Sequence, residues 1–309
     1  FDTEEGFMNS GRRALTSRAR EIIIKNIFAF FAFLSVLFLG LIVFFLFREG
    51  LPLFKEINPV QFLFGSSWYP TYNPPEYGIW PLIVGSAIVT VLACLIAVPF
   101  GLCCAVYISE IAPARIKEIL KSVIELLAGL PSVVLGFFGM VILGPWMQEA
   151  FDLPTGLNIV NASIMLAVMA IPTISSISED ALYAVPRDFK EASYALGATR
   201  YETILRVSIP AALSGISTAV ILGMSRAIGE TMVVLMVAGG SAAVPRGIFD
   251  SVRPMPASIA AEMGEAPVGG GHYHALFATG IVLLLITLLF NLIADHISRR
   301  FKEEGSGTL

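Results

Sequence analysis

Two charged residues, Arg226 and Glu230, lie inside an apolar segment within about Val207 to Val244. A charge at the centre of a bilayer costs about 2.5 to 3.5 kcal/mol on insertion scales, so such a residue normally has a partner or a function. At positions i and i+4 of one helix, the two side chains share a face and can neutralise each other. The spacing predicts either an ion pair inside a helix bundle, or an anion path in which Arg226 attracts the solute and Glu230 weakens its field.

The depth of Arg226 depends on where its helix begins. Counted from Pro210 at 1.5 Å per residue, Arg226 lies about 24 Å along the helix, toward the external side. If the apolar stretch is centred on the bilayer, Arg226 lies near the midplane, and either depth suits an anion path. The candidate path-lining hydroxyls are Ser132, Thr173 and Ser176, beside Pro131 and Pro172. Helix packing explains these residues almost as well, because neighbouring helices also satisfy a kinked backbone. Small residues four apart predict close packing of the fifth helix against another helix; they are Gly215, Ala219, Gly223 and Ala227.

A polar stretch, EASYALGATRYETILRVSIP, separates two of the apolar segments. Asp188 and Glu191 have the spacing of a capping box, and Thr199 and Glu202 repeat it. Gly197, between them, can adopt the left-handed conformation that ends a helix. The pattern predicts two short helices joined by a tight turn, a compact knob on the membrane surface onto which another protein can dock.

Composition places the chain in the membrane. Of its 309 residues 56% are hydrophobic and 14% are charged, far from the averages of soluble domains, and the mean hydropathy is +0.77. The net charge is −4 and no basic run suggests a nucleic-acid partner. Six apolar segments are long enough to span a bilayer: about Ile27 to Phe47, Ile79 to Tyr107, between Glu125 and Gln148, Ile159 to Ser178, within Val207 to Val244, and Ala275 to Ala294.

Basic residues give the orientation. Arg12, Arg13, Arg18, Arg20 and Lys25 precede the first segment, and further basic residues lie in alternate loops and in the tail: Arg115, Lys117, Lys121, Arg187, Lys190, Arg200, Arg206, Arg299, Arg300 and Lys302. The opposite loops carry only Arg48, Lys55, Arg246 and Arg253. The positive-inside rule predicts that both termini and the knob are cytoplasmic. The expected segments are a cytoplasmic segment 1–26, a first transmembrane helix 27–47, a periplasmic loop 48–78, a core 79–298 with a coupling loop 182–206 and a periplasmic loop 239–274, and a tail 299–309. Because Gly305 to Leu309 resembles a vector-derived extension and the chain does not begin with Met, the outermost residues at both ends are left out of the functional argument.

The two long loops expected on the external side are rich in aromatic residues or in Gly and Pro. Trp68, Tyr69, Tyr72, Tyr77 and Trp80 favour an interfacial aromatic belt over a docking surface for an external partner. The loop from about Gly239 to His274 is too polar for lipid and long for a connection, so we expect it to fold partly back toward the mouth of a pore.

The sequence lacks the residues that a nucleotide-hydrolysing, metal-binding or redox site would need. There is no GxxxxGK[ST] stretch for nucleotide hydrolysis. The three Cys residues, Cys94, Cys103 and Cys104, lack paired metal or redox spacing and are predicted to be packing residues. His272 and His274 have no nearby Cys or cluster of acids that would make them a metal site. Four acidic residues are expected to be solvated helix ends: Glu110, Glu125, Glu179 and Asp180.

The polar stretch resembles a family signature. Glu191, Ala192, Ser193, Gly197, Val207, Ile209 and Pro210 match the spacing of the EAA-x3-G-x9-I-x-LP motif of binding-protein-dependent ABC importer permeases; Ser193, Val207 and Ile209 are conservative departures. RAIGETM from Arg226 and ELLAGLPSVVLGFFG from Glu125 resemble the membrane subunits of phosphate-specific importers. YGIWPLIVGS from Tyr77 and MAIPTISSISEDAL from Met169 are closer to the PstC type of permease. The likeness extends from about Ile22 to Arg300.

The resemblance implies an all-α type I importer permease in the bacterial inner membrane, with a core of five helices and one peripheral amino-terminal helix. It implies that Glu191, Ala192, Ser193 and Gly197 form a coupling helix that docks on an ATPase, and that Arg226 and Glu230 act in phosphate translocation. The implied partners are a second, paralogous permease, two ATPase subunits that carry ATP and Mg, and an external phosphate-binding protein. This chain would itself be non-catalytic and hold no cofactor.

Three alternatives remain open at this point. One is a permease for another oxyanion such as molybdate, sulfate or phosphonate. Another is a secondary anion transporter, which needs inverted repeats with paired broken helices; no convincing repeat is found. An intramembrane enzyme lacks a credible catalytic set.

Overall fold

The computed structural model describes the backbone of residues 2–306 and the side chains of residues 21 and 23–296. The tail residues 307–309, and the side chains of the terminal basic residues used for the orientation, lie outside the described residues; these basic residues are Arg12, Arg13, Arg18, Arg20, Arg299, Arg300 and Lys302. The chain forms two compact units, residues 1–49 and 50–309. The first unit is one helix, α1 (Asp2–Gly50), which contains the expected first span. No residue in the apolar window of this helix is buried, as expected of a lipid-facing segment.

The second unit is also helical. Its α-helices are α2 (Pro59–Phe64), α3 (Trp80–Val106), α4 (Ala114–Ala128), α5 (Ser132–Phe138), α6 (Gly144–Phe151), α7 (Ile159–Tyr183), α8 (Arg187–Ala195), α9 (Arg200–Thr203), α10 (Ile209–Ala211), α11 (Leu213–Ile228), α12 (Met232–Val237), α13 (Met255–Glu262) and α14 (Gly271–Ser306). A 3-10 helix, η1, covers Leu51–Lys55, and three π-helical turns are η2 (Tyr107–Ile111), η3 (Gly139–Leu143) and η4 (Ile204–Ser208). Two short strands, β1 (Trp68–Tyr69) and β2 (Glu76–Tyr77), pair antiparallel with Trp68 opposite Tyr77.

The described residues contain five helices, or up to six, that are long and apolar enough to cross a membrane. They are Ile23–Lys55, Trp80–Ile111, Ser132–Phe151, Ile159–Tyr183 and Gly271–His296, with the pair Arg200–Ala211 and Leu213–Ile228 bent by 70°. Two boundaries differ from the prediction. The third span begins at Ser132, because Gly129 to Pro131 interrupt the helix and leave α4 as a separate amphipathic helix. The fifth is not one continuous helix within Val207 to Val244, since it bends before α11 and breaks again before α12.

Helix α7 forms the centre of the bundle, between α3 and α11. Its side chain Ile174, 1% exposed, meets glycines on both neighbours. A Cβ atom at Gly101 of α3 would lie 2.9 Å from Ile174 Cγ2, and one at Gly223 of α11 would lie 2.5 Å from Ile174 Cγ1. Close packing of the predicted small-residue seam is thereby confirmed: Ala219 and Ala227 are buried with Gly223. The seam faces a helix of the same chain.

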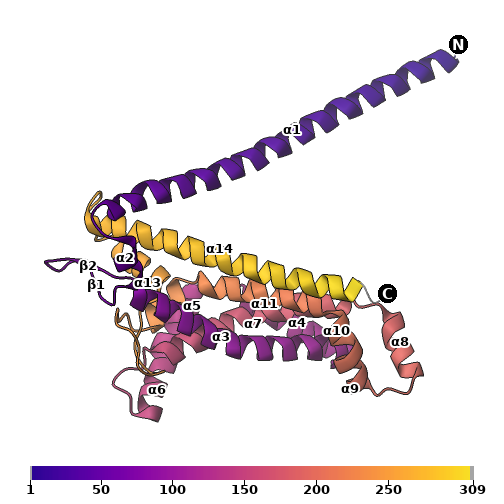
Figure 1. The fold of residues 1–309 in the computed structure, drawn as a ribbon. Helices are drawn as coiled ribbons and strands as arrows, with labels where there is room; N and C mark the ends of the chain where they lie inside the picture. The colour runs from indigo at the N-terminus through magenta and orange to yellow at the C-terminus, as the bar shows by residue number, and fades with distance from the viewer. Residues whose placement is uncertain (1, 307–309) are drawn as a thin grey trace. The chain divides into compact units, whose positions relative to one another are not determined.

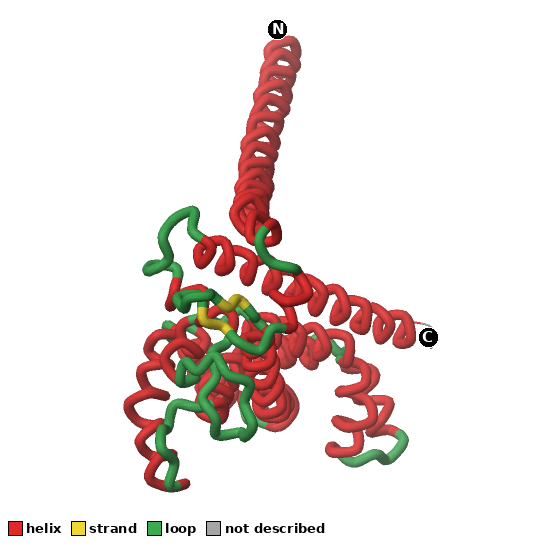
Figure 2. Tube along the Cα trace, turned by 60° about the vertical axis from the view of Figure 1, so that its left-hand side comes forward, coloured by secondary structure: helices red, strands yellow, loops and turns green. Residues whose placement is uncertain are grey.

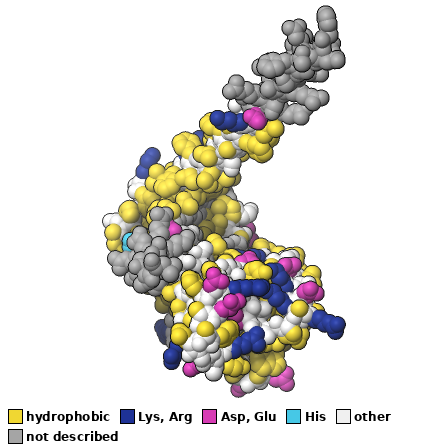
Figure 3. All heavy atoms as spheres, turned by 90° about the vertical axis from the view of Figure 1, so that its right-hand side faces the viewer, with side chains coloured by type: hydrophobic (Ala, Val, Ile, Leu, Met, Phe, Trp, Pro, Cys, Tyr) yellow, Lys and Arg dark blue, Asp and Glu magenta, His cyan; other side chains and the backbone are white. Residues whose placement is uncertain are grey.

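The two ends of the second unit differ in structure. The α8–α9 hairpin lies at one end, close to the end of α14, whereas β1, β2, α2 and α13 lie at the other (Figure 1). Figure 2 shows that both strands and most of the loops gather at this second end. At the hairpin end, Lys, Arg, Asp and Glu side chains cover much of the surface (Figure 3). The bundle therefore separates a charged, hairpin-bearing end from an end built of packed loops.

The packed loops have a core of their own. Trp68 is 1% exposed and packs with Phe62, Ile79 and Leu276, so the predicted belt position is wrong for Trp68. Its indole N–H donates to the partly buried carboxylate of Glu262. Tyr69 and Tyr72 are exposed and stack at a centroid distance of 4.8 Å. The long loop after α12 contains a parallel bridge between Gly239 and Val252 and the short helix α13.

Candidate functional site

Arg226 lies in the last turn of α11, and its side chain is exposed. Its guanidinium Nη1 donates to Thr173 Oγ1 of α7 at 3.4 Å. Within the described part of the chain, no carboxylate lies within 4.0 Å of Arg226 to form an ion pair. Arg226 and Thr173, two of the residues predicted to line the path, are therefore in contact. Most N–H donors of the guanidinium are left to bind another group.

Glu230 has a different place from the predicted one. Helix α11 ends at Ile228 with Gly229 as its C-cap, so Glu230 does not share a helix face with Arg226. Its Oε1 accepts the backbone N–H groups of Met232 and Val233 at 3.1 and 3.3 Å. These N–H groups belong to the first turn of α12 and have no partner within that helix. The predicted ion pair with Arg226 is wrong, because the helix breaks between the two residues and Glu230 caps α12.

The other path candidates are spread along the bundle. Thr173 and Ser176 lie one turn apart on the half-buried face of α7, and Ser176 lines a small cavity with Ser175, Lys121 and Glu179. Ser175 is buried and its Oγ has no partner among the described residues. Ser132 begins α5 and is half buried, and it does not line this cavity. The arrangement gives a line of hydroxyls on α7 that begins beside Arg226.

The α8–α9 hairpin has the predicted turn but not the predicted first cap. Gly197 follows α8 with a φ of +87°, and Thr199 with Glu202 forms a complete capping box; both predictions are confirmed. Asp188 is not the N-cap of α8. That position belongs to Pro186, which fixes the extended backbone before the helix and places Asp188 in its first turn.

The tip of the hairpin presents apolar side chains to solvent. Leu196 is 90% exposed and Tyr201 is 71% exposed. Glu191 and Ala192 are also exposed, whereas Ser193 Oγ lies 2.9 Å from Thr203 Oγ1 and joins α8 to α9. An exposed apolar tip on a charged surface is typical of a protein docking site.

Two acidic residues expected at solvated helix ends are instead buried in ion pairs. Glu110 Oε1 accepts from Lys190 Nζ at 2.7 Å. Glu179 is 4% exposed and pairs with Lys117 and Lys121, each at 2.9 Å, which fastens α4 to α7. The hydrogen bond to Glu179 raises the pKa of Lys121, so this lysine is protonated at neutral pH. Asp180 is exposed, as expected.

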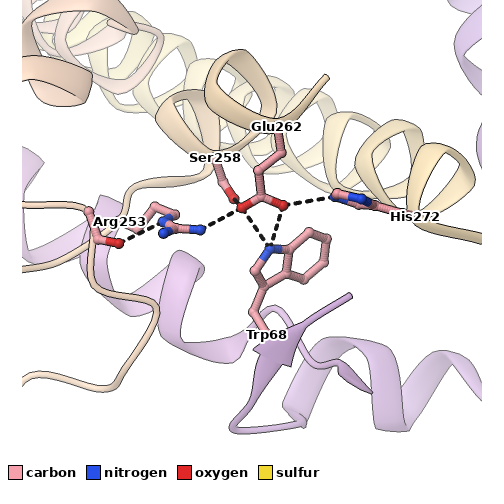
Figure 4. A network of polar contacts seen from close by, with 6 residues as sticks. Trp68, Arg253, Ser258, Glu262 and His272 are labelled. Atoms are coloured by element: carbon pink, nitrogen blue, oxygen red, sulfur yellow. Dashed lines mark hydrogen bonds and ion pairs between the residues drawn. The ribbon is translucent and has the colours of Figure 1, made fainter. Parts of the chain in front are cut away.

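At the opposite end, Glu262 organises the packed loops. Its carboxylate accepts from Trp68 Nε1 at 3.1 and 3.0 Å, from Arg253 Nη1 at 2.5 Å and from Ser258 Oγ at 3.2 Å. His272 Nε2 lies 2.9 Å from its second oxygen. The four partners converge on one carboxylate, as Figure 4 shows, at the wall of an open cavity of about 640 Å³. The carboxylate therefore joins three separate segments of the loop end.

Sequence reasoning missed these ion pairs and the role of Glu262. Lys117 and Lys121 are four residues apart on an amphipathic helix and share a face, a signal that could have suggested a common acidic partner. Glu110 with Lys190, and Trp68 with Glu262, are 80 and 194 residues apart, and no local pattern connects them.

Among the described residues, no group of three or more His, Cys, Asp or Glu side chains is placed to hold a metal ion. Cys94 and Cys104 are half buried in α3, and Cys103 is exposed. His272 is a partner of Glu262.

A bundle of apolar helices with an exposed polar hairpin at one end and a cap of packed loops at the other defines a multi-pass membrane permease. The chain belongs to the family of binding-protein-dependent transport system inner membrane components, whose sequence profile matches residues 97–303. It is a multi-pass protein of the bacterial inner membrane.

Similar proteins agree with this assignment. The probable ABC transporter permease YqgH of Bacillus subtilis is 42% identical over 81% of each chain. The phosphate transport system permease PstC of Mesorhizobium japonicum is 33% identical over 78% of each chain, and PstC 1 of Mycobacterium tuberculosis is 34% identical over 79% of this chain and 83% of its own.

Solved structures share the fold. A bacterial alginate ABC transporter, in complex with an alginate-bound periplasmic protein, matches with a TM-score of 0.60 at 17% identity over 86% of this chain and 94% of its own. The inward-facing MetNI methionine transporter matches with a TM-score of 0.55 at 21% identity over 72% of this chain and 94% of its own. The predicted type I ABC importer core is confirmed by these matches.

Proposed function

We propose that this chain is the membrane permease subunit of an ATP-driven phosphate importer and forms half of its translocation path. The observation that carries the proposal is Arg226, an exposed guanidinium without an ion-pair partner among the described residues, beside the Thr173 hydroxyl. The planar fork of a guanidinium matches the oxygens of phosphate and can bind them in pairs. Relatives named as phosphate transport system permeases support the choice of cargo.

Arg226 attracts the anion, and hydroxyls on α7 continue the path. Thr173 and Ser176 offer hydrogen bonds one helical turn apart, and Ser132 is a further candidate on α5. Glu230 holds α12 at the break after α11. Its negative charge then weakens the local field without pairing with Arg226, so the anion is attracted but not trapped.

ATP hydrolysis belongs to partner chains in this proposal, and the present chain is non-catalytic. The motif residues Glu191, Ala192, Ser193 and Gly197 support α8 as the coupling helix, and the exposed Leu196 at its tip would enter a cleft in an ATPase subunit. ATP and Mg would bind to two such subunits. The remaining partners are a second, paralogous permease and a periplasmic or surface phosphate-binding protein, which would meet the loop end that carries Glu262. By the positive-inside rule the hairpin and both termini are cytoplasmic.

The test is uptake of labelled phosphate by vesicles that contain the complete complex. Arg226→Gln removes the charge but keeps a polar side chain, so we expect uptake to fall about ten- to a hundredfold, the scale of losing a hydrogen bond to a charged group. Copurification of the partner subunits should stay normal. Normal uptake by this variant would leave Arg226 with a structural role and contradict the proposal.

Competition separates phosphate from the other oxyanions. Unlabelled phosphate should suppress uptake of the label, whereas molybdate, sulfate and phosphonate in equal excess should not. If one of these three anions competed more strongly than unlabelled phosphate, that anion would be the cargo and phosphate would not.

A further inference from the structure

Both helices of the hairpin are bonded to a single residue outside it. Lys190 of α8 donates to the Glu110 carboxylate at 2.7 Å, and Arg200 Nη2 of α9 donates to the Glu110 backbone carbonyl. Among the described residues, these are the polar side-chain bonds that leave the hairpin for another part of the bundle. Glu110 therefore holds the hairpin by its side chain and by its backbone.

The position of Glu110 in the fold is unusual. It lies in η2, the π-helical turn in which α3 ends, three residues before Pro113 at the start of α4. π-helical turns within longer helices are frequent at functional sites. Helix α3 packs along the centre of the bundle against α7, so a displacement of η2 is a displacement of one end of a core helix.

The ion pair is well sheltered for a surface hairpin. The Glu110 side chain is 9% exposed and that of Lys190 is 21% exposed. A pair with so little solvent around it is screened less by salt than an exposed one, and loss of either partner leaves a charge without its counterpart. Among the described residues, this contact supplies the polar side-chain bonds between the hairpin and the end of α3, so it is suited to transmit movement between them.

We propose that Glu110 is a positioning residue for transport: it joins α8 and α9 to the end of α3, so that movement of the hairpin during the ATP cycle moves α3. This inference rests on the proposed docking of an ATPase at the hairpin. Without these bonds, the hairpin still docks and ATP is still hydrolysed, but the movement no longer reaches α3 through Glu110.

The experiment measures phosphate transported per ATP hydrolysed by the complete complex in vesicles. In Glu110→Gln, and in Glu110→Lys or Lys190→Glu alone, this ratio should fall about tenfold, within the usual range of coupling between sites, with normal assembly and ATPase rate. The double variant Glu110→Lys with Lys190→Glu should restore the ratio to within about twofold of the unaltered protein, because the ion pair is rebuilt with reversed polarity. Glu118→Gln, an exposed carboxylate on α4, is the matched control and should change nothing.

A second readout does not depend on the cargo. In a variant without native cysteines, Tyr107→Cys places a thiol at the start of η2, where the side chain is 39% exposed. Its rate of maleimide labelling should change when ATP is added, and this change should be lost when Glu110→Gln is also present.

The outcomes separate the two proposals. Vesicles of the unaltered complex that hydrolyse ATP without phosphate uptake would contradict the proposed cargo, and the labelling experiment would still test the joint. An unchanged transport ratio in Glu110→Gln, an exchanged pair no better than the single variants, or an ATP-dependent labelling change that survives Glu110→Gln would overturn the role of Glu110.

Discussion

Gly197 shows how one residue determines the shape of the α8–α9 hairpin. Its φ of +87° is in the region that L side chains avoid, and a Cβ atom there would meet no other group within 4 Å. The requirement for glycine is therefore conformational and not steric. The same residue separates the exposed Leu196 from the capping box that starts α9, so the turn sets the angle at which the hairpin is presented.

Replacing Gly197 by Val should destabilise this turn by at least about 1 to 2 kcal/mol, the cost of the left-handed conformation for an ordinary residue. We expect weaker copurification of the ATPase subunits or ATP hydrolysis that no longer drives transport. Gly197→Asn is the matched control, because asparagine tolerates this conformation, and it should keep most of the coupling. Equal transport by both variants would show that the turn does not matter for docking.

At the scale of elements, glycine acts differently, by allowing helices to approach. Gly215 and Gly223 of α11 face Ala181 and Ile174 of α7 so closely that a Cβ atom would lie 2.4 and 2.5 Å from the nearest side-chain atoms. This contact fixes α11, and hence Arg226, against the α7 hydroxyls. The break after Ile228 then turns the chain into α12, which Glu230 caps.

Gly223→Leu should force α7 and α11 apart, with a loss of about 1 to 3 kcal/mol of stability from overpacking. The expected result is a lower midpoint of thermal unfolding in detergent, and reduced phosphate uptake because Arg226 moves away from Thr173. Gly40→Leu is the control, since a Cβ atom at Gly40 of α1 meets nothing within 4 Å. If both variants unfold at the same temperature as the unaltered protein, the seam is not under steric constraint.

At the scale of the whole second unit, the two ends are built by different means. The charged end is a local hairpin held by Glu110, while the loop end depends on Glu262 to connect β1, the loop before α13 and the start of α14. These segments are distant in sequence, and the carboxylate is 14% exposed. One partly buried carboxylate thus connects segments that no regular sheet joins.

Glu262→Gln should destabilise the loop end by about 2 to 3 kcal/mol, because hydrogen bonds to a charged group are worth more than neutral ones and Arg253 loses its counter-charge. Tryptophan fluorescence should report increased solvent access to Trp68, at a temperature below the global transition. The neighbouring exposed Glu265→Gln should behave as the unaltered protein does. Identical fluorescence transitions for the two variants would contradict the organising role of Glu262.

What the sequence determined about this protein is what depends on composition and on neighbours a few residues apart. Apolar runs of bilayer length identify a membrane bundle, and the Gly197 turn and the Thr199 capping box are set by local backbone bonds. The EAA-type spacing is also local and identifies the class. The small-residue seam was visible as a packing surface because its period is that of the helix itself.

Only the tertiary structure decided which distant groups meet. Glu230 does not share a helix face with Arg226, because α11 ends before Gly229. Its carboxylate instead accepts from N–H groups in the first turn of α12. Lys190 bonds to Glu110, 80 residues away in sequence, and Trp68 bonds to Glu262, 194 residues away. Such pairs form because packing removes charged and polar groups from water and leaves each to be satisfied by whatever donor or acceptor the fold brings near, which no spacing along the chain specifies.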